Sequence, residues 1–202
     1  MFTGIVERMG AVAGISPTDD GARLEIDAGG WPPNAAPGES ISVDGCCLTL
    51  LRAEASRLRF DVVPQTLSRT TLGRWRIGWK ANLERSATLA TLLGGHLVQG
   101  HVDGVGRVID AVSEAKERRV RIAAPPEVSA FLVPRGSVAV NGVSLTIAEV
   151  TEQWFDVALI PETIARTNLS TLRAGDEVNL EADSIAKLVD ASVRRALANS
   201  PP

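Results

Sequence analysis

Apolar and polar residues alternate over short stretches along most of the chain, and glycine and proline separate these stretches. The alternation is clearest at residues 22–26, 40–43, 118–122 and 137–140. A period of two places successive side chains on opposite faces of an extended strand, so each stretch predicts a β-strand. Several short strands at this spacing, in units too small for two large sheets, indicate small closed β-barrels.

Other patterns predict helices. Pro64 and Pro161 stand where a proline suits the first turn of a short helix. Residues 184–198 carry apolar side chains at helical spacing on one face and charged side chains mostly on the other. This amphipathic helix can dock on its own barrel or on another subunit, and the pattern leaves both options open.

The chain repeats itself with a shift of about 97 positions, a period long enough for a whole domain. Matched pairs of segments are 1–6 with 97–102, 44–49 with 141–146, 64–72 with 161–169 and 78–84 with 175–181. Gly94 and Gly95 mark the boundary between the copies. We therefore expect an all-β protein of two tandem homologous six-stranded β-barrels with short helices, at 1–93 and 94–183, followed by a helix and tail at 184–202. Function should lie where the copies differ.

Composition narrows the class of protein. The 202 residues carry a formal net charge of −3, which gives no electrostatic reason to expect nucleic acid or an anionic membrane as partner. Cys46 and Cys47 are the only cysteines and are adjacent, so the chain shows no disulfide framework. Neither a signal peptide nor an apolar run of about 20 residues is present in the sequence. We expect a cytoplasmic protein.

Strand parity places Cys47 and Thr49 on one face of their strand, and Ser144 and Thr146 on the equivalent face in the second copy. Equivalent faces thus present a thiol in one copy and a hydroxyl in the other. A purely structural interpretation makes Cys47 a small buried apolar group and Ser144 a satisfied core hydroxyl. Because the two residues occupy equivalent positions of a duplicated motif, a functional role is favoured as strongly as this structural one.

The two histidines, His96 and His101, are five residues apart and face opposite ways in a regular strand, so we expect no shared metal. His101 replaces Ile5 of the first copy, and a ring that titrates near neutral pH can move protons. Asp183 suits the N-cap of the terminal helix and can still reach a pocket. Thr66 and Thr163 can cap a turn or bind a polyol hydroxyl.

Five motifs together closely resemble the riboflavin synthase family, alpha-chain type, with its tandem lumazine-binding repeats. They are the start MFTGIVE, GCCLT ending at Thr49, GGHLVQGHVD from Gly94, GVSLT from Gly142 and IPET from Ile160. The resemblance implies that two molecules of 6,7-dimethyl-8-ribityllumazine exchange a four-carbon unit, giving riboflavin and 5-amino-6-(D-ribitylamino)uracil. It implies no cofactor and no metal. It also implies a homotrimer joined by the terminal helix, with the reacting pair between the first barrel of one subunit and the second barrel of another, and it allows an association with lumazine synthase.

The resemblance also carries over a set of site residues. The first pocket is expected to use Gly4, Ile5, Val6, Ser40, Cys47, Leu48, Thr49, Asp61, Val62, Val63, Pro64, Gln65 and Thr66. The second is expected to use Gly100, His101, Val102, Arg135, Asn141, Ser144, Leu145, Thr146, Ala158, Leu159, Ile160, Pro161, Glu162 and Thr163. The predicted catalytic residues are Cys47, His101, Ser144, Thr146 and Asp183. In this scheme His101 moves the proton, Ser144 and Thr146 orient it or the ring, and Cys47 provides or orients the nucleophile in the other pocket.

Two positions depart from the commoner family pattern: Arg135 stands where a lysine is frequent, and Gln65 where a glutamate is frequent. Arginine does not act as a neutral base, so Arg135 is interpreted as a charge or hydrogen-bond donor. The main rival class is a non-catalytic lumazine or flavin carrier, and the retention of Cys47, His101 and Ser144 favours the enzyme. A flavin-binding barrel of an electron-transfer enzyme would ordinarily accompany a nucleotide-binding βαβ domain, and the sequence contains no such segment.

Overall fold

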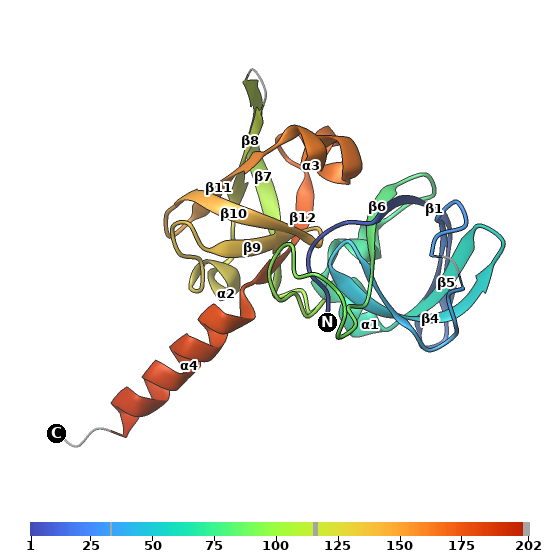
Figure 1. The fold of residues 1–202 in the computed structure, drawn as a ribbon, viewed down its shortest axis with the longest axis horizontal. Helices are drawn as coiled ribbons and strands as arrows, with labels where there is room; N and C mark the ends of the chain where they lie inside the picture. The colour runs from blue at the N-terminus through green and yellow to red at the C-terminus, as the bar shows by residue number, and fades with distance from the viewer. Residues whose placement is uncertain (33, 115–116, 200–202) are drawn as a thin grey trace.

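The computed structural model describes residues 1–32, 34–114 and 117–199, and it contains two closed β-barrels side by side (Figure 1). The first barrel has the strand order β1-β2-β5-β4-β3-β6, with all neighbours antiparallel. Its strands are β1 (Arg8–Thr18), β2 (Gly21–Asp27), β3 (Ser40–Val43), β4 (Cys46–Glu54), β5 (Arg57–Val62) and β6 (Lys80–Arg85).

The second barrel repeats this topology, with the order β10-β11-β8-β7-β12-β9. Its strands are β7 (Gly104–Glu114), β8 (Glu117–Ala123), β9 (Ser137–Val140), β10 (Val143–Val150), β11 (Trp154–Leu159) and β12 (Glu177–Ala182). The predicted fold class, two tandem six-stranded barrels with short helices and a terminal helix, is confirmed. The predicted boundary between residues 93 and 94 falls in the connection between β6 and β7 and stays a prediction.

Alternate side chains of each strand point into the barrel and form its core. In β4 the side chains of Cys46, Leu48 and Leu50 are buried, whereas Cys47 is half-buried and Thr49 is exposed. The strand β10 repeats this pattern. The predicted parity is therefore confirmed: the thiol and the hydroxyls lie on the outer faces of the barrels. Full burial of each large apolar side chain inside contributes about 1.5–3 kcal/mol.

Short helices connect the strands where proline predicted them. The helices α1 (Pro64–Arg69) and α3 (Pro161–Arg166) begin at the two prolines, and the short 3₁₀ helices η1 (Thr71–Arg74) and η2 (Asn168–Thr171) follow them. A further turn of helix, α2 (Pro126–Ser129), precedes β9. Proline at a first helical position removes a backbone N–H that would have no partner within the helix.

The helix α4 (Ser184–Ala198) projects from the second barrel (Figure 1). Asp183 caps it as predicted, because its Oδ1 accepts a hydrogen bond from the Ile185 N–H at 2.8 Å. Lys187 ties the first turn to the barrel through an ion pair with Asp103 at 2.7 Å. No residue of α4 is buried, so the helix does not pack its apolar face on its own barrel. Residues 200–202 of the predicted terminal segment lie outside the described residues.

Among the helices of the described residues, none combines the length and the apolar character that a membrane span requires.

The barrels are joined by a reciprocal exchange of chain segments. Phe2 and Val98 form an antiparallel bridge, in which Phe2 N–H donates to Val98 O at 2.7 Å and Val98 N–H donates to Phe2 O at 3.1 Å. Beyond this bridge each segment crosses to the other barrel. Gly4 O accepts from the Ser144 N–H of β10, and Gly100 O accepts from the Cys47 N–H of β4, both at 2.8 Å. The two contacts are related by the repeat, so we call this pseudo-twofold arrangement the segment exchange.

Two equivalent glutamates hold the exchanged segments. The Glu84 carboxylate of β6 accepts from Thr3 N–H, Thr3 Oγ1 and Gly4 N–H at 2.6–2.9 Å. The Glu181 carboxylate of β12 accepts from the N–H groups of residues 99, 100 and 101 at 2.7–3.0 Å. Burial raises the pKa of both carboxyls, although these hydrogen bonds oppose the shift. A buried carboxyl that satisfies three donors fixes the backbone of the segment it binds.

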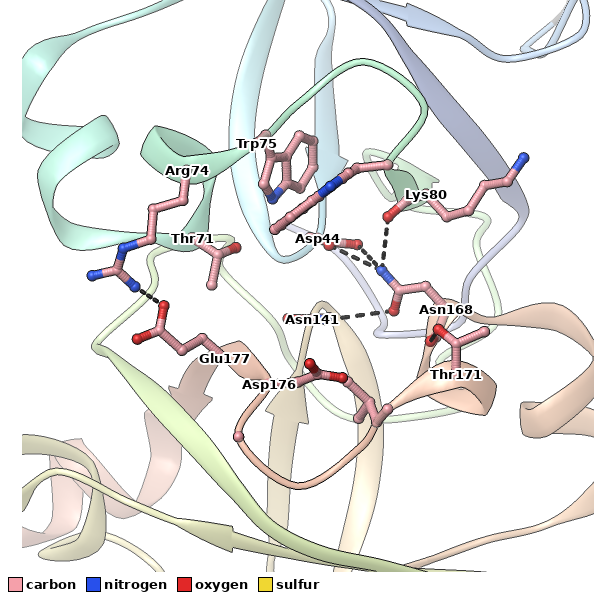
Figure 2. Close-up of a pocket in the computed structure, with 13 residues that line it drawn as sticks. Asp44, Thr71, Arg74, Trp75, Lys80, Asn141, Asn168, Thr171, Asp176 and Glu177 are labelled. Carbon is pink, nitrogen blue, oxygen red and sulfur yellow. Dashed lines mark hydrogen bonds and ion pairs between the residues drawn. The ribbon is translucent and has the colours of Figure 1, made fainter.

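A polar network occupies the rest of the barrel interface. Asn82 and Asn179 are equivalent residues, and each donates through Nδ2 to the backbone carbonyl at the turn of the opposite barrel, at Asn141 and Asp44. Asn168 departs from this symmetry, because its Nδ2 lies 3.0 Å from both oxygens of the Asp44 carboxyl (Figure 2). The repeat equivalent of Asn168 is Thr71, which cannot make that contact. The copies therefore differ at the centre of their interface.

Asp44 is the most perturbed carboxyl of this network. Burial raises its pKa from 3.8 to about 7, although hydrogen bonds from the Asn82 N–H and the Asn168 amide oppose the shift. Its backbone φ of 45° matches the φ of 46° at its repeat equivalent, Asn141. Asparagine is therefore compatible with the backbone at this turn.

The raised pKa of Asp44 makes the free energy of unfolding depend on pH, and Asp44→Asn should remove this dependence. Because folding raises the Asp44 pKa, protonation of this carboxyl favours the folded state. Its contribution to the free energy of unfolding is fully present below pH 3.8 and is lost as pH rises through about 7. The slope reaches at most about 1.4 kcal/mol per pH unit, and the variant should lack it. Urea unfolding at a fixed protein concentration across this range measures the difference, with Asp61→Asn, in an exposed ion pair, as control. Equal slopes in the wild type and Asp44→Asn would contradict the assignment.

Candidate functional site

The outer face of β4 forms the first candidate site. Half-buried Cys47 and exposed Thr49 lie on this face, and Ser40 of β3 stands opposite Thr49 in the register. The strand β4 pairs with β5 only from Leu50 onward, so its first residues form an edge that β5 does not cover. The predicted stretch 61–66 follows at the end of β5 and the start of α1. The segment that follows Val98 takes one donor of this edge, because the Cys47 N–H donates to Gly100 O. Backbone groups of the edge that remain without such a partner can bind the polar rim of a heteroaromatic ring.

The outer face of β10 forms the second candidate site by the same construction. Half-buried Ser144 and exposed Thr146 share this face, and β10 pairs with β11 only from Ile147 onward. The equivalent residues Val63 and Ile160 are exposed beside the two sites, at 55% and 59% of their maximal area. The sites thus share one backbone plan with different side chains.

The segment exchange overturns the expected grouping of residues into pockets. Gly4 lies against Ser144, where a Cβ on Gly4 would stand 2.6 Å from the Ser144 Cβ. Gly100 lies equally close to Cys47. Both glycines have positive φ, at 75° and 81°, so only glycine meets the conformation and the contact at little cost. Gly4 therefore belongs to the Ser144 site and Gly100 to the Cys47 site, the reverse of the expectation.

The neighbouring residues follow the same exchange. Val6 is buried in the core of the second barrel, and Val102 packs against the core of the first. Ile5, between Gly4 and Val6, is 48% exposed. The expectation was wrong because it grouped residues by repeat, whereas the bridge between Phe2 and Val98 carries each segment to the opposite barrel.

His96 is a candidate site residue that sequence reasoning did not identify. Its Nδ1 lies 2.7 Å from Ser144 Oγ, and its backbone N–H donates to Thr3 O at 3.1 Å. Gly95 permits this approach, because a Cβ there would stand 2.7 Å from the Ser144 Cβ. The glycine pair directly before His96 was the available signal, since it allows a backbone to approach a strand closely. The pair of His96 and Ser144 has no counterpart at Cys47 among the described residues.

Burial sets the charge state of His96. It lowers the pKa of the imidazole, and the negative charge of Asp183 opposes the shift. The ring is therefore neutral at pH 7, with one nitrogen able to accept a proton. Its Nε2 is buried and has no hydrogen-bond partner among the described residues. A neutral imidazole in contact with a serine hydroxyl is equipped to exchange a proton with that hydroxyl.

His101 lies apart from Ser144. It follows Gly100 on the segment that covers Cys47, its backbone N–H donates to Glu181 Oε2 at 3.0 Å, and its side chain is exposed. Within one chain the histidine that contacts Ser144 is His96, and the expectation that Ser144 and Thr146 orient His101 or the ring stays a prediction. A catalytic role for His101 stays a prediction for the Cys47 site.

The other predicted site residues occupy different surroundings. Asn141 is buried in the barrel interface, where its Oδ1 accepts from the Asn179 N–H at 2.8 Å. Arg135 is exposed in the turn before β9, with a φ of 65°. Leu48, Val62, Leu145 and Leu159 point into the barrel cores and can offer only backbone groups. The carbonyls of Thr66 and Thr163 accept from the threonines that end their short helices.

Acidic, histidine and cysteine side chains form no group of three with metal-binding geometry within the described residues.

Comparison with known proteins identifies the family. A lumazine binding domain model matches residues 3–86 and 99–183. The riboflavin synthase of Mycobacterium tuberculosis is 42% identical over 97% of this chain and 100% of its own length, and that of Chlamydia pneumoniae is 38% identical over 99% and 98%. Crystal structures of LumP complexed with 6,7-dimethyl-8-(1'-D-ribityl) lumazine and with riboflavin superpose with TM-scores of 0.79 and 0.82, at 31% and 30% identity, over 90% of this chain and 99% of LumP. The chain therefore belongs to the riboflavin synthase family of enzymes and consists of two lumazine-binding domains in tandem.

Proposed function

We propose that this protein converts two molecules of 6,7-dimethyl-8-ribityllumazine into riboflavin and 5-amino-6-(D-ribitylamino)uracil. A four-carbon unit, the two ring carbons with their methyl groups, passes from one lumazine to the other. The observation that carries the proposal is the identity of 42% with a riboflavin synthase over nearly the whole of both chains. The ligand-bound LumP structures support a lumazine as ligand.

The duplicated architecture suits a reaction between two identical molecules. Two copies of one substrate need two similar binding sites, yet one molecule donates carbon and the other accepts it. The two equivalent strand edges, each bonded to a segment of the other repeat, supply the similarity. The difference comes from the side chains, since one site has Cys47 and the other has Ser144 in contact with His96.

The proton chemistry fits the second site. The reaction begins when a proton leaves the 7-methyl group of one lumazine, whose anion is delocalised into the ring, while a nucleophile adds at C7 of the other. We assign His96 and Ser144 to proton transfer at the β10 site and Thr146 to orientation of the ring. Asp183 acts on this site through its charge, which opposes the lowering of the His96 pKa. Cys47 and His101 remain proposed for the nucleophile and for proton transfer at the β4 site.

Alignment of the rings should supply most of the acceleration, since good positioning alone can contribute about 7–11 kcal/mol. Within one chain the two sites lie on the outer faces of different barrels, so we infer that the reacting pair forms between the first barrel of one subunit and the second of another. The exposed apolar face of α4 supports its assignment to a homotrimer contact. An association with lumazine synthase and a cytoplasmic location stay predictions.

A non-catalytic lumazine or flavin carrier is the second candidate, and the likeness to LumP at 31% identity supports it. The synthases are more similar, at 42%. The chain also retains Cys47, His101 and Ser144, together with the contact between His96 and Ser144. These observations favour the enzyme.

The purified full chain, dialysed against a chelator, should form riboflavin from the lumazine alone, and the absorbance of riboflavin measures this turnover.

A chain that ends at Asp183 is the matched control for α4. Loss of this helix should convert a trimer to monomers and abolish turnover, as sedimentation and absorbance will show. A requirement for added metal, nucleotide or flavin would contradict the proposed reaction. An unchanged trimer in the truncated chain would contradict the role of α4.

Ser144→Ala and His96→Gln should each lower kcat by roughly 100-fold, with a smaller effect on substrate affinity. The acid limb of the kcat profile should depend on His96 and disappear in His96→Gln, because protonation of the ring removes its free acceptor. Cys47→Ser is the comparison variant, and it should keep substantial activity if Cys47 orients the nucleophile or the substrate, since a hydroxyl can still hydrogen-bond. Steady-state kinetics across pH measure both effects. Normal kcat in either variant removes that residue from the mechanism.

A further inference from the structure

A cavity of about 470 Å³ lies on the pseudo-twofold axis between the barrels, next to the polar network (Figure 2). The residues that line it come in repeat-related pairs, such as Thr71 with Asn168 and Trp75 with Leu172, each separated by 97 positions. One wall is thus the first copy of a surface and the other wall is the second copy. The volume falls in the range of small-molecule sites, about 300–1,000 Å³.

The two walls have diverged in chemistry. The first wall carries Trp75 and Trp79, and the equivalent positions of the second wall carry Leu172 and Asp176. All the aromatic side chains of the cavity therefore belong to the first barrel. Figure 2 shows Trp75 on one side of the cavity, with Asp176 and Glu177 on the other. A cavity bounded by indole rings on one side and carboxylates on the other suits a flat ligand with a polar edge.

Two buried side chains on the first wall have polar groups without partners. Thr71 is 5% exposed and Trp75 is 6% exposed. Neither the Thr71 hydroxyl nor the Trp75 indole N–H makes a hydrogen bond to any described residue. The repeat equivalents on the second wall differ. Asn168 donates from its side-chain amide to Asp44, and the side chain of Leu172 has no polar group. Neither atom is among the buried polar atoms of the described residues that lack a partner, so both are open to the cavity, where a ligand can accept their hydrogen bonds.

We propose that this axial cavity binds an amino-substituted planar heteroaromatic ring of the size of a purine or a pteridine. The ring stacks beside the indoles, and its acceptor atoms receive hydrogen bonds from Trp75 Nε1 and Thr71 Oγ1. Its amino group donates to the carboxylate of Asp176, which already accepts one bond, from the Arg173 N–H. The inference is independent of the proposed dismutation, because neither Cys47 nor Ser144 lines the cavity.

The charges around the cavity disfavour other ligand classes. An anion would face the carboxyls of Asp44 and Asp176. The nearby cations do not compensate, because Arg74 is paired with Glu177 and the Lys80 ammonium is turned away in Figure 2. A simple organic cation would satisfy Asp176 but would leave the donors of Thr71 and Trp75 without acceptors.

The test follows the four indole N–H signals of the full chain by NMR during titration with pterin, guanosine or choline. Pterin or guanosine should shift the Trp75 and Trp79 signals in a saturable way below about 1 mM. Trp31, which donates to Glu7, and Trp154, which stacks under Arg121, should not move. Trp79→Leu and Asp176→Asn alter exposed side chains, so they should fold normally and weaken binding at least about tenfold.

Trp154→Leu is the matched control and should bind both probes as the wild type does. The proposal is overturned if neither pterin nor guanosine gives saturable shifts, or if Asp176→Asn and Trp79→Leu bind as tightly as the wild type. It is also overturned if choline alone saturates the site, or if the two signals shift with protein concentration in the absence of a probe. Because the readout is a local signal and not turnover, a failure to form riboflavin leaves this result interpretable.

Discussion

The antiparallel bridge between Phe2 and Val98 is the contact on which the rest of the molecule depends. It sends residues 4–6 to the second barrel and residues 100–102 to the first, where each segment covers an edge that the barrel's own strands leave open. Each candidate site therefore consists of a strand from one repeat and a segment from the other. Neither barrel completes its candidate site alone.

The exchange explains how the two copies share one backbone plan and yet carry different side chains. Equivalent backbone contacts fix Gly4 and Gly100, and equivalent glutamates satisfy the donors beside them. Side chains at the two sites can therefore differ while these backbone contacts stay the same. The second site has a buried imidazole against Ser144, the first has a thiol, and the axial cavity is aromatic on one wall and acidic on the other.

Much of this could be predicted from local patterns. Strand alternation located the barrels, the prolines located α1 and α3, and Asp183 was identified as the cap of α4, because each depends on residues close in sequence. The grouping of Gly4 with Cys47 failed because it depends on a contact between residues 96 positions apart, which no periodicity encodes. His96 was missed for the same reason: its partner Ser144 lies on another strand, and only the glycine pair before it hinted at a close approach.

The most direct test of the segment exchange is the reactivity of the Cys47 thiol toward a disulfide reagent in the native protein, since Cys46 is only 2% exposed. A methyl group on Gly100 would stand 2.6 Å from the Cys47 Cβ, so Gly100→Ala should displace the covering segment and raise the Cys47 rate at least about tenfold. Gly4→Ala should leave that rate unchanged and perturb the His96 ring signals instead. The reverse pattern, with Cys47 exposed by Gly4→Ala and indifferent to Gly100→Ala, would contradict the exchange.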